Sequence, residues 1–94
     1  MPYITPEQRE LLDPVIKALF DALRATHIGP PRPGDVNYYC ISKLVWSLFE
    51  DNVSYTNGQN LIGTLACVQA EFYRRKLAPY EDQKLQENGD VILC

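Results

Sequence analysis

Residues 59–77 read QNLIGTLACVQAEFYRRKL, and this stretch decides the fold. Its large apolar residues recur at spacings of four, three and four, which is the period of one face of an α-helix. They are Leu61, Leu65, Val68 and Phe72. Pro79 follows shortly after, and a proline inside a helix ends or kinks it. We therefore expect a long helix over residues 59–87, kinked at Pro79 and closed by the C-terminal cap pair Asn88-Gly89.

Further helices are predicted on the N-terminal side of this stretch. Thr5-Pro6-Glu7-Gln8 combines an N-cap threonine, a proline at the first helical position and a glutamine three residues after the cap. Asp13-Pro14 repeats the start signal, so we expect two consecutive N-terminal helices within residues 5–26. Asp35 is an N-cap candidate for a central helix over residues 35–49. Residues 27–34, rich in proline and glycine, predict a stiff extended loop between these helices.

These elements predict an all-α fold: a single domain over residues 1–94, built as a small bundle of three to four helices. A chain of 94 residues is long enough to bury a core without metal or disulfide support. The tail over residues 88–94 ends in a short apolar run, Val-Ile-Leu-Cys, which we expect to dock on a neighbour or to add a short edge strand.

The central helix carries apolar residues on every side, and such a helix must be covered on more than one face. Its most prominent aromatic residues are Tyr39, Trp46 and Phe49. So few helices seldom provide that cover within one chain, so we expect a homo-oligomer with these three residues at the interface.

Composition excludes several classes of protein. The net charge of −3 argues against general binding to DNA, RNA or anionic membranes. No segment has the length of apolar sequence that spans a bilayer, and the N-terminus does not resemble a signal peptide. Three cysteines, an odd number, suggest reduced thiols rather than a disulfide framework. We therefore expect a cytoplasmic protein.

The strongest functional candidate is the cation segment, Arg74-Arg75-Lys76, which lies between Tyr73 and Tyr80. Guanidinium groups beside aromatic rings hold flat anions such as nucleotides, or anchor protein interfaces. A structural role is the alternative. Arg75 lies one turn after Glu71 and suits an ion pair within the helix, whereas Arg74 has no such partner in this reading and is expected to be available. For Lys76 the structural alternative is that its aliphatic stem lies along a packed pair of tyrosines, Tyr73 and Tyr80, without contacting a ligand.

Catalytic and metal-binding signals are weak. A single histidine, His27, and cysteines without an adjacent base favour neither zinc nor nucleophilic catalysis. Carboxylates spaced as in magnesium-dependent nucleotide pyrophosphohydrolases occur near both ends of the chain. They are Glu7, Glu10 and Asp13, and Glu87 and Asp90. Because magnesium needs converging oxygens and these lie at helix ends, that enzyme is a remote alternative. We expect no catalytic residues, no metal and no cofactor.

Several linear motifs together resemble a known family. They are Met1-Pro2-Tyr3-Ile4, Gly34-Asp35-Val36-Asn37-Tyr38, Glu71-Phe72-Tyr73-Arg74-Arg75, Ala78-Pro79-Tyr80-Glu81-Asp82 and Asn88-Gly89-Asp90-Val91. The chain is similar over nearly its whole length to small helical proteins of tailed phages and prokaryotes that carry a domain-of-unknown-function label. The resemblance implies a phage-type context, but brings no activity and no assigned residues.

In that context we expect a non-enzymatic binding protein. The favoured function is counter-defence: sequestering a nucleotide-like signalling molecule at subunit junctions, with ligand contacts from Arg74, Lys76, Tyr73, Tyr80 and Arg75. The alternative is an inhibitor or adaptor that binds a host protein through the same surface.

Overall fold

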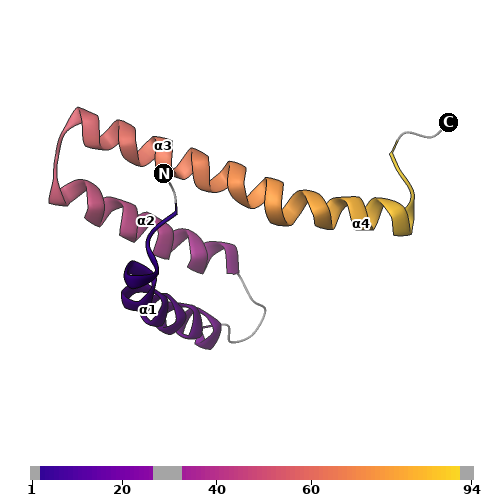
Figure 1. Cartoon of the computed structure of the whole chain (residues 1–94), viewed down its shortest axis with the longest axis horizontal. Helices are drawn as coiled ribbons and strands as arrows, with labels where there is room; N and C mark the ends of the chain where they lie inside the picture. The colour runs from indigo at the N-terminus through magenta and orange to yellow at the C-terminus, as the bar shows by residue number, and fades with distance from the viewer. Residues whose placement is uncertain (1–2, 27–32, 92–94) are drawn as a thin grey trace. The chain divides into compact units, whose positions relative to one another are not determined.

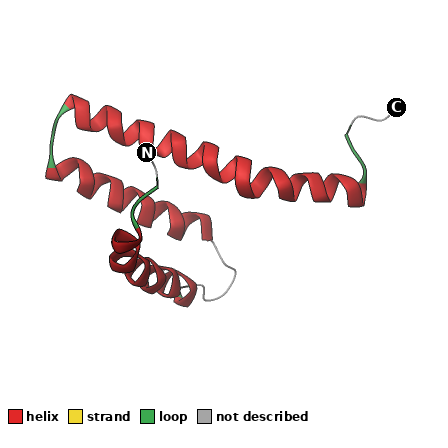
Figure 2. Cartoon of the chain, viewed as in Figure 1, coloured by secondary structure: helices red, strands yellow, loops and turns green. Residues whose placement is uncertain are grey.

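The structure is a computed structural model that describes residues 3–26 and 33–91. Its elements are α1 (Pro6–Ala25), α2 (Pro33–Asp51), α3 (Tyr55–Phe72), the π-helical turn η1 (Tyr73–Leu77) and α4 (Ala78–Asn88) (Figures 1 and 2). Within these ranges there is no strand, so the all-α prediction is confirmed. Most of the predicted loop over residues 27–34 and the end of the tail, residues 92–94, lie outside the described residues.

Helix α1 begins at the predicted capping box. The Gln8 backbone N–H donates to Thr5 Oγ1 at 3.3 Å, and the Thr5 backbone N–H donates to Gln8 Oε1 at 2.9 Å. The prediction of two short helices is wrong, because α1 continues through Pro14. Proline removes one backbone hydrogen bond, but ending a helix and nucleating another costs more than propagating past that gap.

Helix α2 is longer at both ends than the predicted range 35–49. It begins at Pro33, since the fixed φ of proline suits the first helical position. Asp35 therefore lies in the first turn and is not the N-cap. In this position its negative charge stabilises the helix by interacting with the positive end of the helix dipole. Residues 33 and 34, predicted as part of the loop, belong to this helix.

Helix α3 starts four residues before the predicted Gln59. Ser54 is its N-cap, because its Oγ accepts the backbone N–H of Asn57 at 3.0 Å. Only Asn52 to Ser54 separate α2 from α3. Most of the polar run over residues 50–58 is helical, so the connection between α2 and α3 is short.

No loop separates α3 from α4 (Figure 1). Pro79 lacks the N–H that would bond the carbonyl of Arg75, and its ring would crowd that carbonyl in a regular α-helix. Just before it the helix widens into the π turn, in which the Ala78 N–H donates to the carbonyl of Tyr73, five residues back. The helix ends as predicted at Gly89, whose φ of 91° favours glycine and whose N–H donates to Leu85 at 2.9 Å.

Contacts divide the chain into two units, one up to Trp46 and one from Ser47. In the described part of each unit no side chain is buried, and 25 large apolar side chains are exposed. The predicted bundle core is therefore not formed within either unit, and the single-domain assignment stays a prediction. None of the described helices has the length and apolar character needed to cross a membrane.

Candidate functional site

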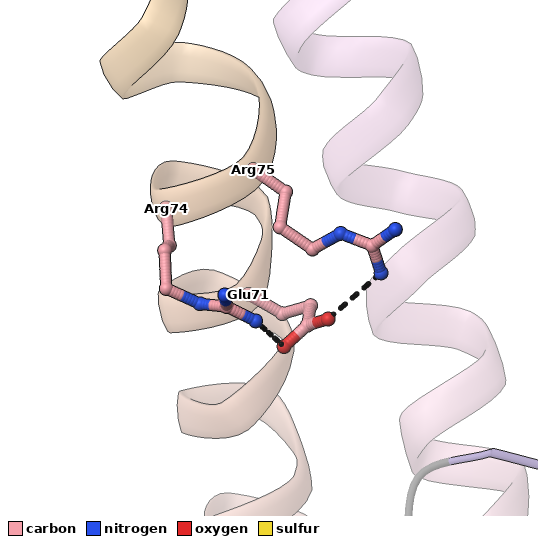
Figure 3. A network of polar contacts seen from close by, with 3 residues as sticks. All are labelled: Glu71, Arg74 and Arg75. Atoms are coloured by element: carbon pink, nitrogen blue, oxygen red, sulfur yellow. Dashed lines mark hydrogen bonds and ion pairs between the residues drawn. The ribbon is translucent and has the colours of Figure 1, made fainter.

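The cation segment lies on the π turn, which holds Arg74, Arg75 and Lys76. Glu71, in the last turn of α3, contacts two of these cations through its carboxylate. Its Oε2 lies 3.2 Å from Arg74 Nη2 and its Oε1 lies 3.0 Å from Arg75 Nη1. Figure 3 shows the two guanidinium groups reaching the two oxygens of this carboxylate.

This arrangement confirms the ion pair predicted for Arg75, and it shows that the prediction for Arg74 is wrong. Arg74 was expected to lack a partner, but residues three apart on a helix are neighbours as well as residues four apart. The Arg74 side chain remains 69% exposed and that of Arg75 55% exposed. Exposed pairs of this kind contribute only about 0.2–1 kcal/mol each. Glu71 therefore reduces the local charge of the segment without locking either arginine in place.

Lys76 is the third member of the segment, and its side chain forms no ion pair with any residue in the described ranges. Of the three cations, Arg74 and Arg75 therefore pair with Glu71, and Lys76 does not.

The two tyrosines beside the segment have different partners. The Tyr73 hydroxyl donates a hydrogen bond to the Glu81 carboxylate, and this contact, with the negative charges of Glu81 and Asp82, raises the pKa of Tyr73. The ring of Tyr80 lies 5.7 Å from Lys84 Nζ, a cation–π distance.

The π turn explains why Tyr73 contacts Glu81. In a regular α-helix, residues seven apart lie on the same face two turns on, which would align Tyr73 with Tyr80. A π turn takes up one additional residue, because its hydrogen bonds span five residues instead of four. The residue aligned with Tyr73 therefore becomes Glu81, eight positions later.

The three predicted interface aromatics have different environments. Tyr39 and Trp46 are 64% and 62% exposed, in the unit that ends at Trp46. Phe49 is half-buried in the other unit, where its Cε1 lies 3.5 Å from the position that a Cβ on Gly58 would take. Their role as an interface stays a prediction.

Phe49 belongs to a groove that the sequence did not predict, here called the elbow groove. It lies where the last turn of α2 meets the start of α3 and has a volume of ≈ 820 Å³. Its apolar and glycine lining consists of Phe49, Val53, Tyr55, Gly58, Ile62 and Gly63. Ser54 and Gln59 complete the lining, so no charged residue faces it.

Asn57 holds the elbow together. Asn52 donates its N–H to Phe49, three residues back, at 3.1 Å, so the carbonyl of Leu48 needs another donor. The Asn57 side-chain nitrogen supplies it at 3.1 Å and also donates to the carbonyl of Asn52 at 2.8 Å. The sequence signal for this contact is the pair Ser54 and Asn57, a capping residue and the first-turn residue that it caps.

The remaining chemical candidates do not converge. Among the described residues, no group of three or more His, Cys, Asp or Glu side chains is placed to hold a metal ion. Glu87 forms an ion pair with Lys84 at 3.1 Å instead. Cys40 is half-buried, Cys67 is exposed, and His27 lies outside the described residues.

Comparison with known proteins gives one match. No curated protein and no solved structure is detectably similar to this chain. A family model described as a domain of unknown function, DUF6899, matches residues 1–91. The resemblance to an uncharacterised family is thereby confirmed, and the match spans every described residue. The chain belongs to the DUF6899 family.

Proposed function

We propose that this chain is a non-enzymatic binding protein whose apolar helix faces bind other protein chains. One observation carries the proposal: no described side chain is buried, while large apolar side chains are exposed on every helix. Water disfavours such exposure by about 25 cal/mol per Å² of apolar surface, so these faces gain stability when another chain covers them.

Many of the large apolar residues of the chain are exposed. They include Leu11, Val15, Phe20, Tyr39, Trp46, Ile62 and Phe72, all more than half exposed. Single exposed residues of this kind are normal on a protein surface, but here they occur on helices in which no described side chain is buried. Such a chain suits a homo-oligomer, or an inhibitor or adaptor of a host protein.

A second candidate function is favoured by the cation segment. Arg74 and Arg75 pair with Glu71, Lys76 follows them on the same turn, and the aromatic residue Tyr73 precedes them. Under this proposal the segment binds a nucleotide-like anion, with contacts from Arg74, Lys76 and Tyr80. In a phage-type setting, such binding would sequester a signalling molecule in the host cytoplasm. Glu71 weakens this candidate, because an anionic ligand must compete with it for both arginines.

Native mass spectrometry separates the two candidates. The purified chain would be measured alone and with a pool of cyclic and linear nucleotides. The first candidate predicts an oligomer whose mass stays the same when nucleotides are added. A monomer whose apolar helix faces are protected in a hydrogen-exchange measurement would contradict it. The second expects a stoichiometric gain of nucleotide mass.

A matched pair of variants tests the second candidate. Arg74→Ala should abolish nucleotide binding, whereas Lys17→Ala removes a cation from an ion pair with Asp21 at 2.9 Å on α1 and should leave binding unchanged. Equal binding by both variants would exclude Arg74 from the ligand site.

A further inference from the structure

We infer that the long helix formed by α3, η1 and α4 pairs with the same helix of a second copy, antiparallel to it and with Ala78 at the centre of the contact. The inference rests on the proposed protein-binding function and specifies both the partner and the surface. Its basis is the arrangement of charge about Ala78. Arg74 lies four residues before this alanine and Asp82 four residues after it, all within the unit that begins at Ser47.

The π turn places Arg74 and Asp82 on the same side of the helix. In an uninterrupted α-helix, residues eight apart are rotated by about 80° from one another, because each residue turns by about 100°. The π turn takes up one additional residue, so this rotation falls to roughly zero, as it does for Tyr73 and Glu81. Arg74 and Asp82 therefore share one flank of the helix, roughly 12 Å apart along its axis. That separation is too large for the two side chains to pair within one chain.

A two-fold axis at Ala78 brings these two charges together. In an antiparallel pair, a residue before the centre meets the residue at the same number of positions after the centre. Arg74 of each copy therefore meets Asp82 of the other, and this ion pair forms twice. A parallel pair would place Arg74 against Arg74 and Asp82 against Asp82. Only the antiparallel pair is thus free of like-charge contacts at these two positions.

Both charged groups are available for such a contact. Asp82 is exposed and forms no ion pair with any residue in the described ranges. The Arg74 side chain is 69% exposed, and its contact with Glu71 uses Nη2, which leaves further N–H donors on the guanidinium group. Glu81 is the other acid on this face, and it already accepts the hydroxyl of Tyr73 in its own chain.

The side chains around Ala78 suit a close pair of helices. The small side chain of Ala78 lets the two axes approach to the short end of the usual 8–10 Å range. Tyr73 and Leu85 lie on the other flank, where they are 51% and 45% exposed. They are five positions before and seven positions after the centre, so Tyr73 of one copy lies close to Leu85 of the other. The pairing therefore covers apolar surface as well as joining opposite charges.

This symmetry favours a second copy over a different protein. Opposite charges at equal distances on either side of one residue are what a surface needs in order to meet itself. A different partner can complement any pattern of charge, so it would not require this one. Complementary charges of this kind also fix the register and orientation of the pair.

Reversing the charges tests the inference. Arg74→Asp places two acids against each other, and Asp82→Arg places two cations against each other. Either change should raise the dimer dissociation constant about tenfold or more, because each reversal acts twice in a two-fold contact. Lys76→Asp is the matched control. It changes the net charge by as much as Arg74→Asp does, but it lies two residues further along the turn, on roughly the opposite side of the helix.

Two combinations restore complementary charge. The double variant Arg74→Asp/Asp82→Arg exchanges the two charges, so its copies should associate again. An equimolar mixture of the two single variants should form a heterodimer, because one chain then carries two acids and the other two cations at the facing positions. Recovery in this mixture requires that positions 74 and 82 meet each other across two copies.

The assay is sedimentation equilibrium over a range of protein concentrations, with circular dichroism to check that every variant keeps its helicity. The expected result is a wild-type dimer, weaker association of each single variant alone, and recovery in the double variant and in the mixture. A wild-type oligomer that both single variants leave intact would overturn the inference, while the proposed function would stand. Weakening without recovery would also overturn it, since the two residues would then not face each other.

A wild-type monomer would overturn the inference as well, and hydrogen exchange then decides the proposed function. If the apolar helix faces of that monomer are protected, the proposed function falls with the inference. If they are unprotected, the proposed function stands and the partner is a different protein.

Discussion

Replacing Asn57 tests how the elbow between α2 and α3 is held. Its side-chain nitrogen donates to the carbonyls of Leu48 at 3.1 Å and Asn52 at 2.8 Å. Each bond contributes about 1 kcal/mol net, and alanine regains about 0.5 kcal/mol through its higher helix propensity. Asn57→Ala should therefore lower the free energy of unfolding by about 1.5 kcal/mol.

The assay is urea unfolding followed by circular dichroism, at the same protein concentration for every variant because any association would contribute to stability. At a typical dependence on urea, the midpoint should fall by roughly 1 M. Asn60→Ala is the matched control. Asn60 lies on the same helix, and its exposed side chain forms no hydrogen bond with any residue in the described ranges. This control should leave the midpoint unchanged or raise it slightly.

Asn57→Asp distinguishes the hydrogen bonds from a helix-end effect. An acid in the first turn of α3 would be stabilising if only the helix dipole mattered. If the two carbonyl contacts dominate, the carboxylate repels both oxygens, and the variant should lose at least as much stability as Asn57→Ala at pH 7. Part of that loss should be recovered as the carboxyl is protonated below about pH 4, since the acid can then donate. Wild-type stability for both variants at pH 7 would refute the reasoning and leave water as the partner of these carbonyls.

Three further outcomes are expected. Thr5→Ala removes the capping box of α1 and should cost about 1 kcal/mol of helix stability, measured by thermal unfolding against Thr64→Ala; equal melting curves would contradict it. Glu81→Gln should lower the raised pKa of Tyr73 toward its ordinary value of 10.0, which ultraviolet titration against Tyr73→Phe would detect. Because that pKa is raised in the folded chain, any stability from the contact is present below the ordinary value and is lost as the pH rises through the raised one. Pro79→Ala restores a backbone N–H donor, so the π turn is no longer required. The variant should show higher helicity by circular dichroism and a lower pKa of Tyr73. An unchanged pKa would mean that the π turn does not depend on the proline.

The elements predicted well are those that depend on local spacing. Apolar periodicity located the helices, and side-chain spacing alone identified the Thr5 capping box and the pair between Glu71 and Arg75. These contacts join residues three or four apart, so the sequence contains all the geometry that they need. The missed pair between Arg74 and Glu71 also joins residues three apart, so the same spacing rule would have predicted it.

The features missed for physical reasons involve a balance between competing interactions. Pro14 and Pro79 carry the same local signal, but the first is absorbed within α1 and the second is accompanied by a π turn. Which outcome prevails depends on the cost of nucleation and on the bonds available in that turn, and neither is visible in a spacing pattern. The elbow groove was missed because it depends on Phe49 approaching Gly58 across the turn between α2 and α3, which no spacing pattern specifies.

The π turn at Tyr73–Leu77 also sets which side chains α4 presents relative to α3. Deleting one residue from it would let an α-helix run directly from α3 into α4 and would leave every later side chain on its present face, because the π turn takes up one additional residue. Deleting a residue from the regular helix on either side would instead rotate the later side chains by roughly 100° about the helix axis. The π turn can therefore lose one residue without re-aiming the surface of α4.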